Sequence, residues 1–179
     1  MKAEIISVGT EIILGGTLNT NTYYLTQRLS ESGIDVLFHT SVGDDPDILQ
    51  DVIKIGLKRA DLLIFTGGLG PTADDMTKEI VSRTLGLELE LDQVVEEDIK
   101  KYFSRINRQM SSNNTKQAYH PVGSKFLINE IGTAPGIYIQ WNGKILILLP
   151  GPPKEMNLMF EKYVIPLIKQ SLIIKIETI

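Results

Sequence analysis

The chain has 179 residues, a length that suits one domain with a substantial hydrophobic core. Hydrophobic residues make up 42% of it and charged residues 22%, as in ordinary soluble globular proteins. A net charge of -4 disfavours nucleic acid and anionic membranes as partners, and the absence of cysteine excludes disulfides, thiolate metal sites and a cysteine nucleophile. We expect a cytoplasmic enzyme or binding domain, because no apolar run is long enough to span a bilayer and the first residues do not resemble a signal peptide.

Three apolar runs in the first half of the chain are typical of buried strands: residues 3–8, 34–42 and 62–65. The segments between them have helical spacing and begin at capping residues, in 19–22 for the first helix and at Asp45 or Asp47 for the second. Strands that alternate with helices predict right-handed βαβ units and a mainly parallel sheet. We expect the first helix to bury Tyr23, Tyr24, Leu25 and Leu29, and the second to carry Ile48, Leu49, Val52, Ile53 and Leu57 at core spacing.

Each of these strands ends in a turn rich in glycine and carboxylates. The turns are Gly9-Thr10-Glu11, Gly43-Asp44-Asp45 and the loop 67–75. Because ligands of parallel sheets collect beyond the carboxyl ends of the strands, we expect the three turns to meet at one site.

The loop 67–75 is the most informative of the three. It has three glycines in four residues, then the adjacent carboxylates Asp74 and Asp75, and leads to a helix that Thr77 can cap. A strand, a glycine loop and a helix N-terminus together are typical of a phosphate-binding site. The two aspartates would repel phosphate unless a divalent cation lay between them, so the pattern indicates metal-assisted phosphate chemistry. The alternative is a tight turn with solvated aspartates.

The second half of the chain predicts smaller elements. Residues 86–91 alternate like an edge strand, Asp92 can cap a helix through about Arg105, and 107–123 is a polar, irregular connection. A strand is expected at 125–129, and Asn142-Gly143 predicts a hairpin between 136–141 and 144–149. A last helix follows 150–153, and 171–179 is expected to be a terminal strand or the start of a connection to a further domain, which leaves 1–170 as the domain proper. The inward residues of these helices are expected to be Val94, Val95, Ile99, Tyr102 and Phe103, then Met156, Met159 and Phe160.

Two further segments offer polar groups to a site. Lys116 and Gln117 suit a phosphate or a purine edge, although the segment can equally be a polar loop. Lys154 can contact a phosphate or cover apolar surface with its stem. We expect His120 to be structural.

The glycine loop, taken with other segments, resembles a known family. Thr66–Gly70 with Asp75-Met76-Thr77 resembles the molybdopterin-binding family of MogA, MoaB and gephyrin-like domains, and the match is closer to the N-terminal domain of the CinA (competence/damage-inducible protein) family. The matching pieces run in order to about residue 168: Gly9-Thr10-Glu11, Asn19-Thr20-Asn21, Val42–Asp45, Gly67–Asp75, Lys116-Gln117-Ala118, Gly132–Gly136 and Leu149–Met156. The resemblance implies a three-layer α/β/α sandwich with a mostly parallel sheet and an antiparallel edge.

The same resemblance implies an activity. In the molybdopterin family, the acids that match Asp44 and Asp75 are tied to activity, and an arginine usually stands where this chain has Asp74. That departure favours the CinA branch, whose domains are associated with divalent-metal-dependent hydrolysis of ADP-ribose to AMP and ribose 5-phosphate. A homodimer or homotrimer is implied as well. Full CinA proteins usually carry a second domain that deamidates nicotinamide mononucleotide, to which this chain does not extend.

We therefore predict a nucleotide pyrophosphatase that needs Mg²⁺ or a similar cation such as Mn²⁺ or Co²⁺. The alternatives are a pterin-binding or adenylyl-transferring domain of molybdenum-cofactor synthesis, and a non-catalytic nucleotide-binding module. The predicted catalytic residues are Asp44, Asp75 and Lys116. The metal is expected on Asp44 and Asp75, helped by Asp45, Asp74 and Glu11. The predicted substrate-binding residues are Thr66, Gly67, Gly68, Gly70, Thr77, Asn19, Asn21, Gln117, Gly151, Pro152 and Lys154.

Overall fold

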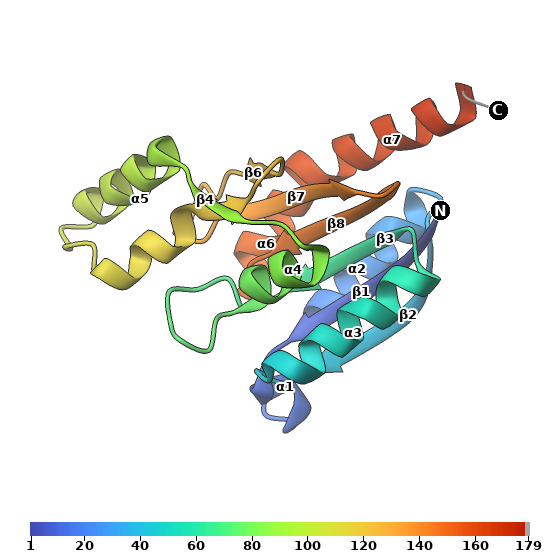
Figure 1. Ribbon diagram of the computed structural model, residues 1–179, viewed down its shortest axis with the longest axis horizontal. Helices are drawn as coiled ribbons and strands as arrows, with labels where there is room; N and C mark the ends of the chain where they lie inside the picture. The colour runs from blue at the N-terminus through green and yellow to red at the C-terminus, as the bar shows by residue number, and fades with distance from the viewer. Residues whose placement is uncertain (178–179) are drawn as a thin grey trace.

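The computed structural model describes residues 1–177 and places a six-stranded sheet at the centre of the chain (Figure 1). The strand order is β2-β1-β3-β8-β7-β6. The pairs β1/β2, β1/β3 and β3/β8 are parallel, whereas β7 is antiparallel to both of its neighbours. The predicted mostly parallel sheet with an antiparallel edge is confirmed. Its strands are β1 (Lys2–Val8), β2 (Asp35–Val42), β3 (Leu62–Thr66), β6 (Lys125–Leu127), β7 (Gly136–Trp141) and β8 (Lys144–Leu149).

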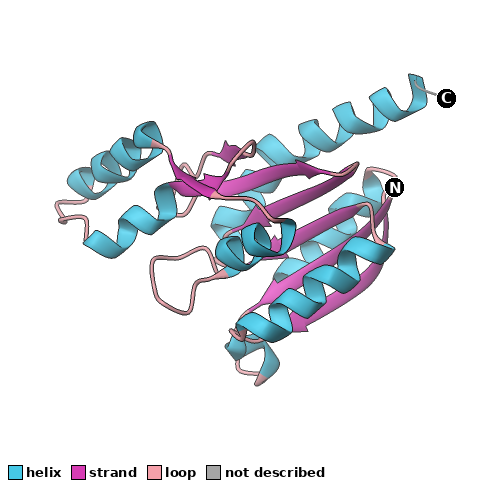
Figure 2. Cartoon of the chain, viewed as in Figure 1, coloured by secondary structure: helices cyan, strands magenta, loops and turns pink. Residues whose placement is uncertain are grey.

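Helices cover both faces of this sheet, as Figures 1 and 2 show. On one face lie α2 (Thr20–Glu31), α6 (Pro153–Met159) and α7 (Ile165–Glu177), with the π-helical turn η2 (Phe160–Val164) between the last two. On the other lie α3 (Pro46–Arg59) and α4 (Thr77–Leu85). Neighbouring strand residues point to opposite faces, so Ile5 and Ile6 of β1 belong to the two different cores. The chain is thus a three-layer α/β/α sandwich.

Local signals explain where three helices begin. The side chain of Asn19 accepts a hydrogen bond from the N–H of Thr22, and Asp45 and Asp92 each accept two from the first turn of α3 and of α5 (Gln93–Arg105). At the predicted hairpin, Asn142 and Gly143 both have positive φ, which suits the tight turn between β7 and β8.

Thr77 does not cap α4. The residue before that helix is Met76, and Thr77 instead donates its hydroxyl to the carbonyl of Gly67 at 2.9 Å. Three residues that were expected to face the core are largely exposed: Tyr23 of α2, Ile48 of α3 and Val94 of α5. The face that each of these helices buries is narrower than the apolar face predicted from its sequence.

The middle of the chain departs most from expectation. Only Leu89–Leu91 (β4) is extended in 86–91, because Gly86 ends α4 in the left-handed conformation, and β4 pairs with β5 (Tyr119–Pro121) in a separate two-stranded sheet. The connection expected to be irregular contains the 3-10 helix η1 (Ser112–Ala118) and β5. With α5 they form the unit that extends from one end of the molecule (Figure 1).

The predicted terminal strand is wrong for the described residues, since α7 continues to Glu177, and 178–179 lie outside them. The short helix α1 (Thr10–Ile13) follows β1 directly. No helix within residues 1–177 has the length and hydropathy to cross a membrane.

Candidate active site

A cavity of about 470 Å³ lies beyond the carboxyl ends of β1, β2, β3 and β8. All three predicted strand-end turns contribute to its wall: Gly9 and Glu11 after β1, Asp44 after β2, and the loop after β3. The turn at 150–153 after β8 closes the fourth side. Parallel strands that end together therefore bring segments far apart in the sequence to one place.

Asp44 is held by the turn after β1. Its Oδ2 accepts the N–H of Thr10 at 3.0 Å and the hydroxyl of Thr10 at 2.7 Å, and its own N–H donates to that hydroxyl at 3.1 Å. Gly43 lies so close that an added Cβ would approach Thr10 Oγ1 to 3.3 Å. One carboxylate oxygen is therefore committed, and within residues 1–177 Oδ1 accepts no hydrogen bond.

Asp75 is held in the same manner within the glycine loop. Its Oδ2 accepts the N–H of Thr72 at 3.0 Å and the hydroxyl of Thr72 at 2.5 Å, and no described residue donates to its Oδ1. The carboxylate lies against the α-carbon of Gly70, where a Cβ would come within 2.5 Å of Oδ2. Glycine at position 70 thus makes room for the aspartate.

The start of the glycine loop is bent tightly across β1. Gly67 and Gly68 have φ of 97° and 68°, and a Cβ on them would overlap the carbonyl oxygen of Val8 and the hydroxyl of Thr77. Gly67 is a predicted substrate-binding residue, but its N–H donates to Leu149 O at 3.0 Å. This N–H is therefore not free to bind a phosphate. Within the described residues, the N–H groups of Gly68, Leu69 and Gly70 donate to no acceptor, and Gly68, Leu69 and Gly70 line the cavity.

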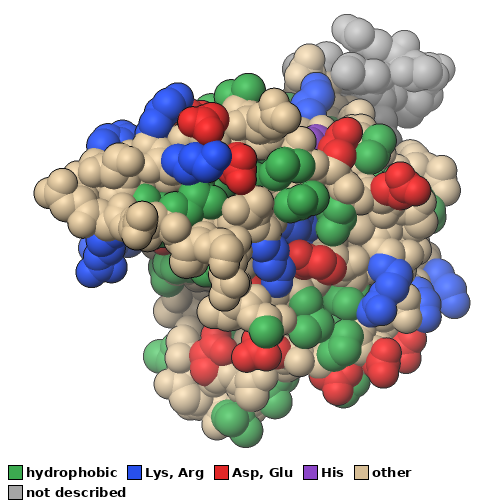
Figure 3. All heavy atoms as spheres, turned by 60° about the vertical axis from the view of Figure 1, so that its left-hand side comes forward, with side chains coloured by type: hydrophobic (Ala, Val, Ile, Leu, Met, Phe, Trp, Pro, Cys, Tyr) green, Lys and Arg blue, Asp and Glu red, His purple; other side chains and the backbone are tan. Residues whose placement is uncertain are grey.

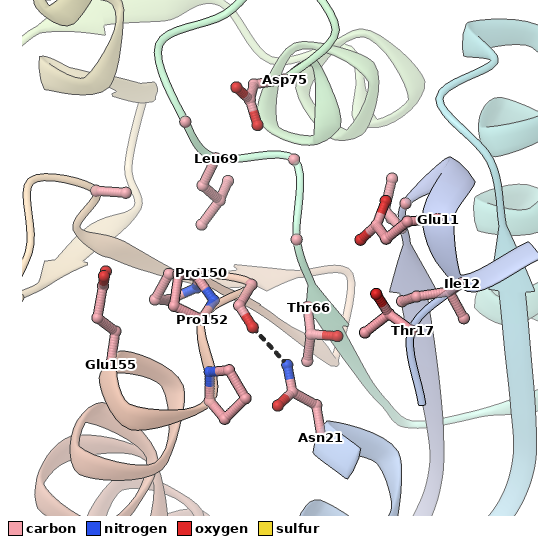
Figure 4. Close-up of a pocket in the computed structure, with 18 of the residues that line it drawn as sticks. Glu11, Ile12, Thr17, Asn21, Thr66, Leu69, Asp75, Pro150, Pro152 and Glu155 are labelled. Carbon is pink, nitrogen blue, oxygen red and sulfur yellow. Dashed lines mark hydrogen bonds between the residues drawn. The ribbon is translucent and has the colours of Figure 1, made fainter. Parts of the chain in front are cut away.

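The cavity wall carries negative charge without a compensating cation. Five carboxylates line it, and among the described residues no lysine, arginine or histidine does: the acids are Glu11, Asp44, Asp74, Asp75 and Glu155. Glu11, Asp75 and Glu155 approach from three different sides (Figure 4). On the face drawn in Figure 3, lysine and arginine side chains lie on the projecting end at the left and also at the centre and the right.

These donors suit a hard divalent cation that also binds substrate. Within residues 1–177 no three acidic or histidine side chains lie close enough together to hold a metal ion by themselves. Mg²⁺ is commonly held by one or two carboxylates together with substrate phosphates and water, and the free oxygens of Asp44 and Asp75 are ligands of that kind. The predicted cation remains a prediction.

Four predicted site residues lie outside the cavity wall: Asp45, Thr77, Lys116 and Lys154. Asp45 caps α3, accepting from the N–H groups of Asp47 and Ile48. Lys154 is exposed to solvent on the first turn of α6. The other predicted residues do line the cavity: Asn19, Asn21, Thr66, Gly67, Gly68, Gly70, Gln117, Gly151 and Pro152, with the acids Glu11, Asp44, Asp74 and Asp75.

Lys116 lies outside the cavity wall and holds the glycine loop by hydrogen bonds to its backbone. Its ammonium group donates to the carbonyl oxygen of Thr72 at 3.0 Å and to that of Asp75. Next to it, Gln117 donates to Leu69 O at 3.4 Å. Lys78 of α4, 5% exposed, donates to Lys116 O, and burial lowers its pKa to about 8. We infer that η1 positions the loop, and that Lys116 acts through it.

Asn21 joins α2 to the turn after β8. Its Nδ2 donates to Gly151 O at 2.8 Å (Figure 4), which fixes the orientation of the amide. Its Oδ1 is buried and no described residue donates to it. The neighbouring Asn19 donates to Ser7 Oγ at 2.9 Å, so both amides shape the cavity wall from below the sheet edge.

Three residues of the site are not among the residues predicted from the sequence: Thr10, Thr72 and Glu155. Thr10 adjoins Glu11 in the sequence, but its bonds to Asp44 depend on the meeting of two distant turns. Thr72 lies three residues before Asp75, and its bonds form within the glycine loop. Glu155 lies in the segment Leu149–Met156, where its charge two residues after Pro153 was the available signal.

Comparison with known proteins gives the family. The family model described as "Probable molybdopterin binding domain" matches residues 4–170. The chain belongs to this family. It is 52% identical over 166 residues to a CinA-like protein of Dictyoglomus turgidum, covering 93% of this chain and 40% of that protein. It is 55% identical over 170 residues to a competence-damage inducible protein of Caldicellulosiruptor saccharolyticus, covering 95% and 41%. The chain therefore spans about two-fifths of these curated relatives.

Solved structures place the chain in the CinA branch of the family. The crystal structure of CinA from Thermoplasma acidophilum matches with a TM-score of 0.83 and 35% identity, covering 89% of this chain and 94% of that one. MoaB of Thermus thermophilus, a molybdopterin biosynthesis enzyme, matches with a TM-score of 0.60 and 19% identity, covering 89% and 87%. The second likeness shows the shared fold alone.

Proposed function

We propose that this domain hydrolyses the pyrophosphate of ADP-ribose, or of a related dinucleotide, with the help of a divalent cation. The observation that carries the proposal is the cavity, which is lined both by loop residues whose N–H groups have no acceptor within residues 1–177 and by acids that have no cationic partner in the wall. N–H groups suit phosphate, and the acids suit a cation that accompanies it. Membership in the CinA branch supports the same reading.

The loop N–H groups and the aspartates would have separate roles in this reaction. Gly68, Leu69 and Gly70 would donate their N–H groups to phosphate oxygens, and Asp44 and Asp75 would hold the cation through Oδ1. When bound, a divalent cation supplies positive charge to the phosphates and acidifies a water.

Glu11 or Asp74 would accept a proton from the water that attacks one phosphorus, and the bond from that phosphorus to the bridging oxygen breaks. One water is consumed, and AMP and ribose 5-phosphate are formed.

The proposal is tested by incubating the purified chain with ADP-ribose and Mg²⁺, Mn²⁺ or Co²⁺ and measuring AMP. We expect AMP with at least one metal and its loss on chelation. Asp75→Ala should reduce kcat by about 100-fold, the size of effect typical of removing a group that stabilises the transition state. Asp51→Ala, an exposed carboxylate on α3 outside the cavity, is the matched control and should keep wild-type activity.

An inert wild type that binds molybdopterin tightly would contradict the hydrolase and favour a pterin-binding or adenylyl-transferring domain. Tight binding of ADP-ribose without turnover would favour a non-catalytic binding module. A homodimer or homotrimer, a cytoplasmic location and the division between residues 1–170 and 171–179 stay predictions.

A further inference from the structure

Glu155 occupies a distinct position in the cavity. It lies on the first turn of α6, and in Figure 4 its carboxylate approaches the cavity from the side opposite Glu11. Asp44 and Asp75 are each held by a threonine, whereas Glu155 is held by an amide from a different part of the chain. The end of the cavity at Glu155 therefore offers different chemistry from the end at Glu11.

Asn129 fixes the Glu155 carboxylate as a hydrogen-bond acceptor. The Oδ1 of Asn129 accepts the N–H groups of Ile131 at 3.2 Å and Gly132 at 2.8 Å, so its Nδ2 must be the donor. That Nδ2 donates to Glu155 Oε2 at 2.7 Å and to Ala134 O at 2.9 Å.

Gly132 completes this arrangement. A Cβ at position 132 would overlap the Glu155 carboxylate, so glycine lets the carboxylate lie directly against the backbone. Within residues 1–177, Glu155 Oε1 accepts no hydrogen bond and Glu155 pairs with no cation. The result is a carboxylate of the cavity wall that is held by one hydrogen bond and by contact with the backbone, and whose Oε1 no described residue donates to.

The charge of the wall selects what Glu155 can accept. A phosphate oxygen has no proton to donate to the carboxylate of Glu155, and within residues 1–177 the one hydrogen-bond partner of this carboxylate, Asn129, is neutral. Its Oε1 can therefore accept a hydrogen bond from a neutral donor such as a hydroxyl group. A carboxylate that accepts from the 2′-hydroxyl of a ribose is a recurrent way of binding dinucleotides.

We propose that Glu155 is a specificity-determining residue that accepts a hydrogen bond from a ribose 2′-hydroxyl of the substrate. The inference rests on the proposed function and orients the substrate in the cavity. The pyrophosphate lies at Gly68–Gly70 and the sugar at Glu155. Asn129 is its positioning residue.

The test compares KM and kcat of the wild type and Glu155→Gln on four substrates. These are ADP-ribose, its two 2′-deoxy analogues (one for each ribose) and the analogue with hypoxanthine in place of adenine. For one deoxy analogue the wild-type KM should be about tenfold higher than for ADP-ribose, because the free energy of a hydrogen bond to a charged group corresponds to at least a tenfold change in affinity. Glu155→Gln should raise the KM for ADP-ribose by about the same factor, with little change in kcat. The variant should then have similar KM values for ADP-ribose and for that deoxy analogue. Glu88→Gln, an exposed glutamate outside the cavity, is the matched control.

If Glu155→Gln changed KM and kcat equally for all four substrates, Glu155 would have only a structural role, and the inference would be overturned. Sensitivity to the hypoxanthine analogue alone would assign Glu155 to the base, which also overturns it. If the wild type does not hydrolyse ADP-ribose, the proposed function fails by itself. The four ligands are then compared by calorimetry with Mg²⁺ present, and the inference stands only if Glu155→Gln removes the preference for one 2′-hydroxyl.

Discussion

Two aspartates in the cavity share one local design, in which a threonine holds one oxygen and leaves the other free. Thr10 comes from the turn after a different strand than Asp44, whereas Thr72 lies three residues before Asp75 in the same loop. The same chemistry is thus reached once by tertiary contact and once by local sequence. Holding a carboxylate by two hydrogen bonds limits its rotation, which preorganises it for a ligand.

The hydroxyl of Thr72 should therefore matter more to activity than its size. Thr72→Val keeps the shape and the backbone N–H but removes the hydroxyl that donates to Asp75 Oδ2, and we expect kcat/KM for the proposed hydrolysis to fall about tenfold. Thr72→Ser keeps the hydroxyl and should stay within about twofold of wild type. Steady-state kinetics of the two variants check this. Equal activities would show that the hydroxyl does not position Asp75.

At the scale of elements, η1 and α4 support the glycine loop together. Lys116 braces two carbonyl groups of the loop, and Lys78 binds the carbonyl of Lys116 in turn. The sequence predicts Lys116 as a catalytic residue but not its contacts with the loop carbonyls, because a residue type does not reveal which of its distant neighbours it will meet. The caps at Asn19, Asp45 and Asp92 were predictable because their partners lie within three residues.

Lys78 makes stability depend on pH. Its pKa is lowered from 10.5 to about 8, chiefly by burial, with Lys116 lowering it and Glu79 raising it. Between these two values the unfolded chain binds a proton that the folded chain does not, so Lys78 adds stability as the pH rises. Below about pH 8 both states are protonated and this contribution is absent.

We expect the free energy of unfolding of the wild type to gain roughly 2 to 3 kcal/mol relative to Lys78→Met between pH 7 and pH 10. Urea denaturation of both proteins at several pH values measures the difference, and the titration of groups that do not interact with Lys78 contributes equally to both proteins. Curves that stay parallel from pH 7 to pH 10 would contradict the lowered pKa.

At the scale of the whole molecule, the architecture was more predictable than the site. Alternating strand and helix patterns predicted the parallel sheet, and its topology then required three strand-end turns to meet. An edge strand was predicted where β4 lies, but η1, β5 and the pairing of β4 with β5 were not, because within residues 1–177 these two three-residue strands pair with each other and not with the main sheet. Glu155 was missed for a related reason, since its bond to Asn129 joins α6 to the loop after β6.

A buried ion pair between Glu4 and Arg59 connects the sheet to the helix layer that contains α3. Glu4, fully buried in β1, accepts from Arg59 at the end of α3 at 2.5 and 2.8 Å and from Thr40 of β2 at 2.6 Å. Arg59→Met would leave this carboxylate without its cation, which should cost about 3 kcal/mol of unfolding free energy.

The double variant Glu4→Gln/Arg59→Met should recover part of that loss, because no buried charge remains unpaired. Lys54→Met, which breaks an exposed pair with Asp51, is the control and should cost less than about 1 kcal/mol. Urea denaturation of all four proteins measures these values. If Arg59→Met cost no more than Lys54→Met, the Glu4 pair would not hold the layers together, and packing between α3 and the sheet alone would account for the stability of that face.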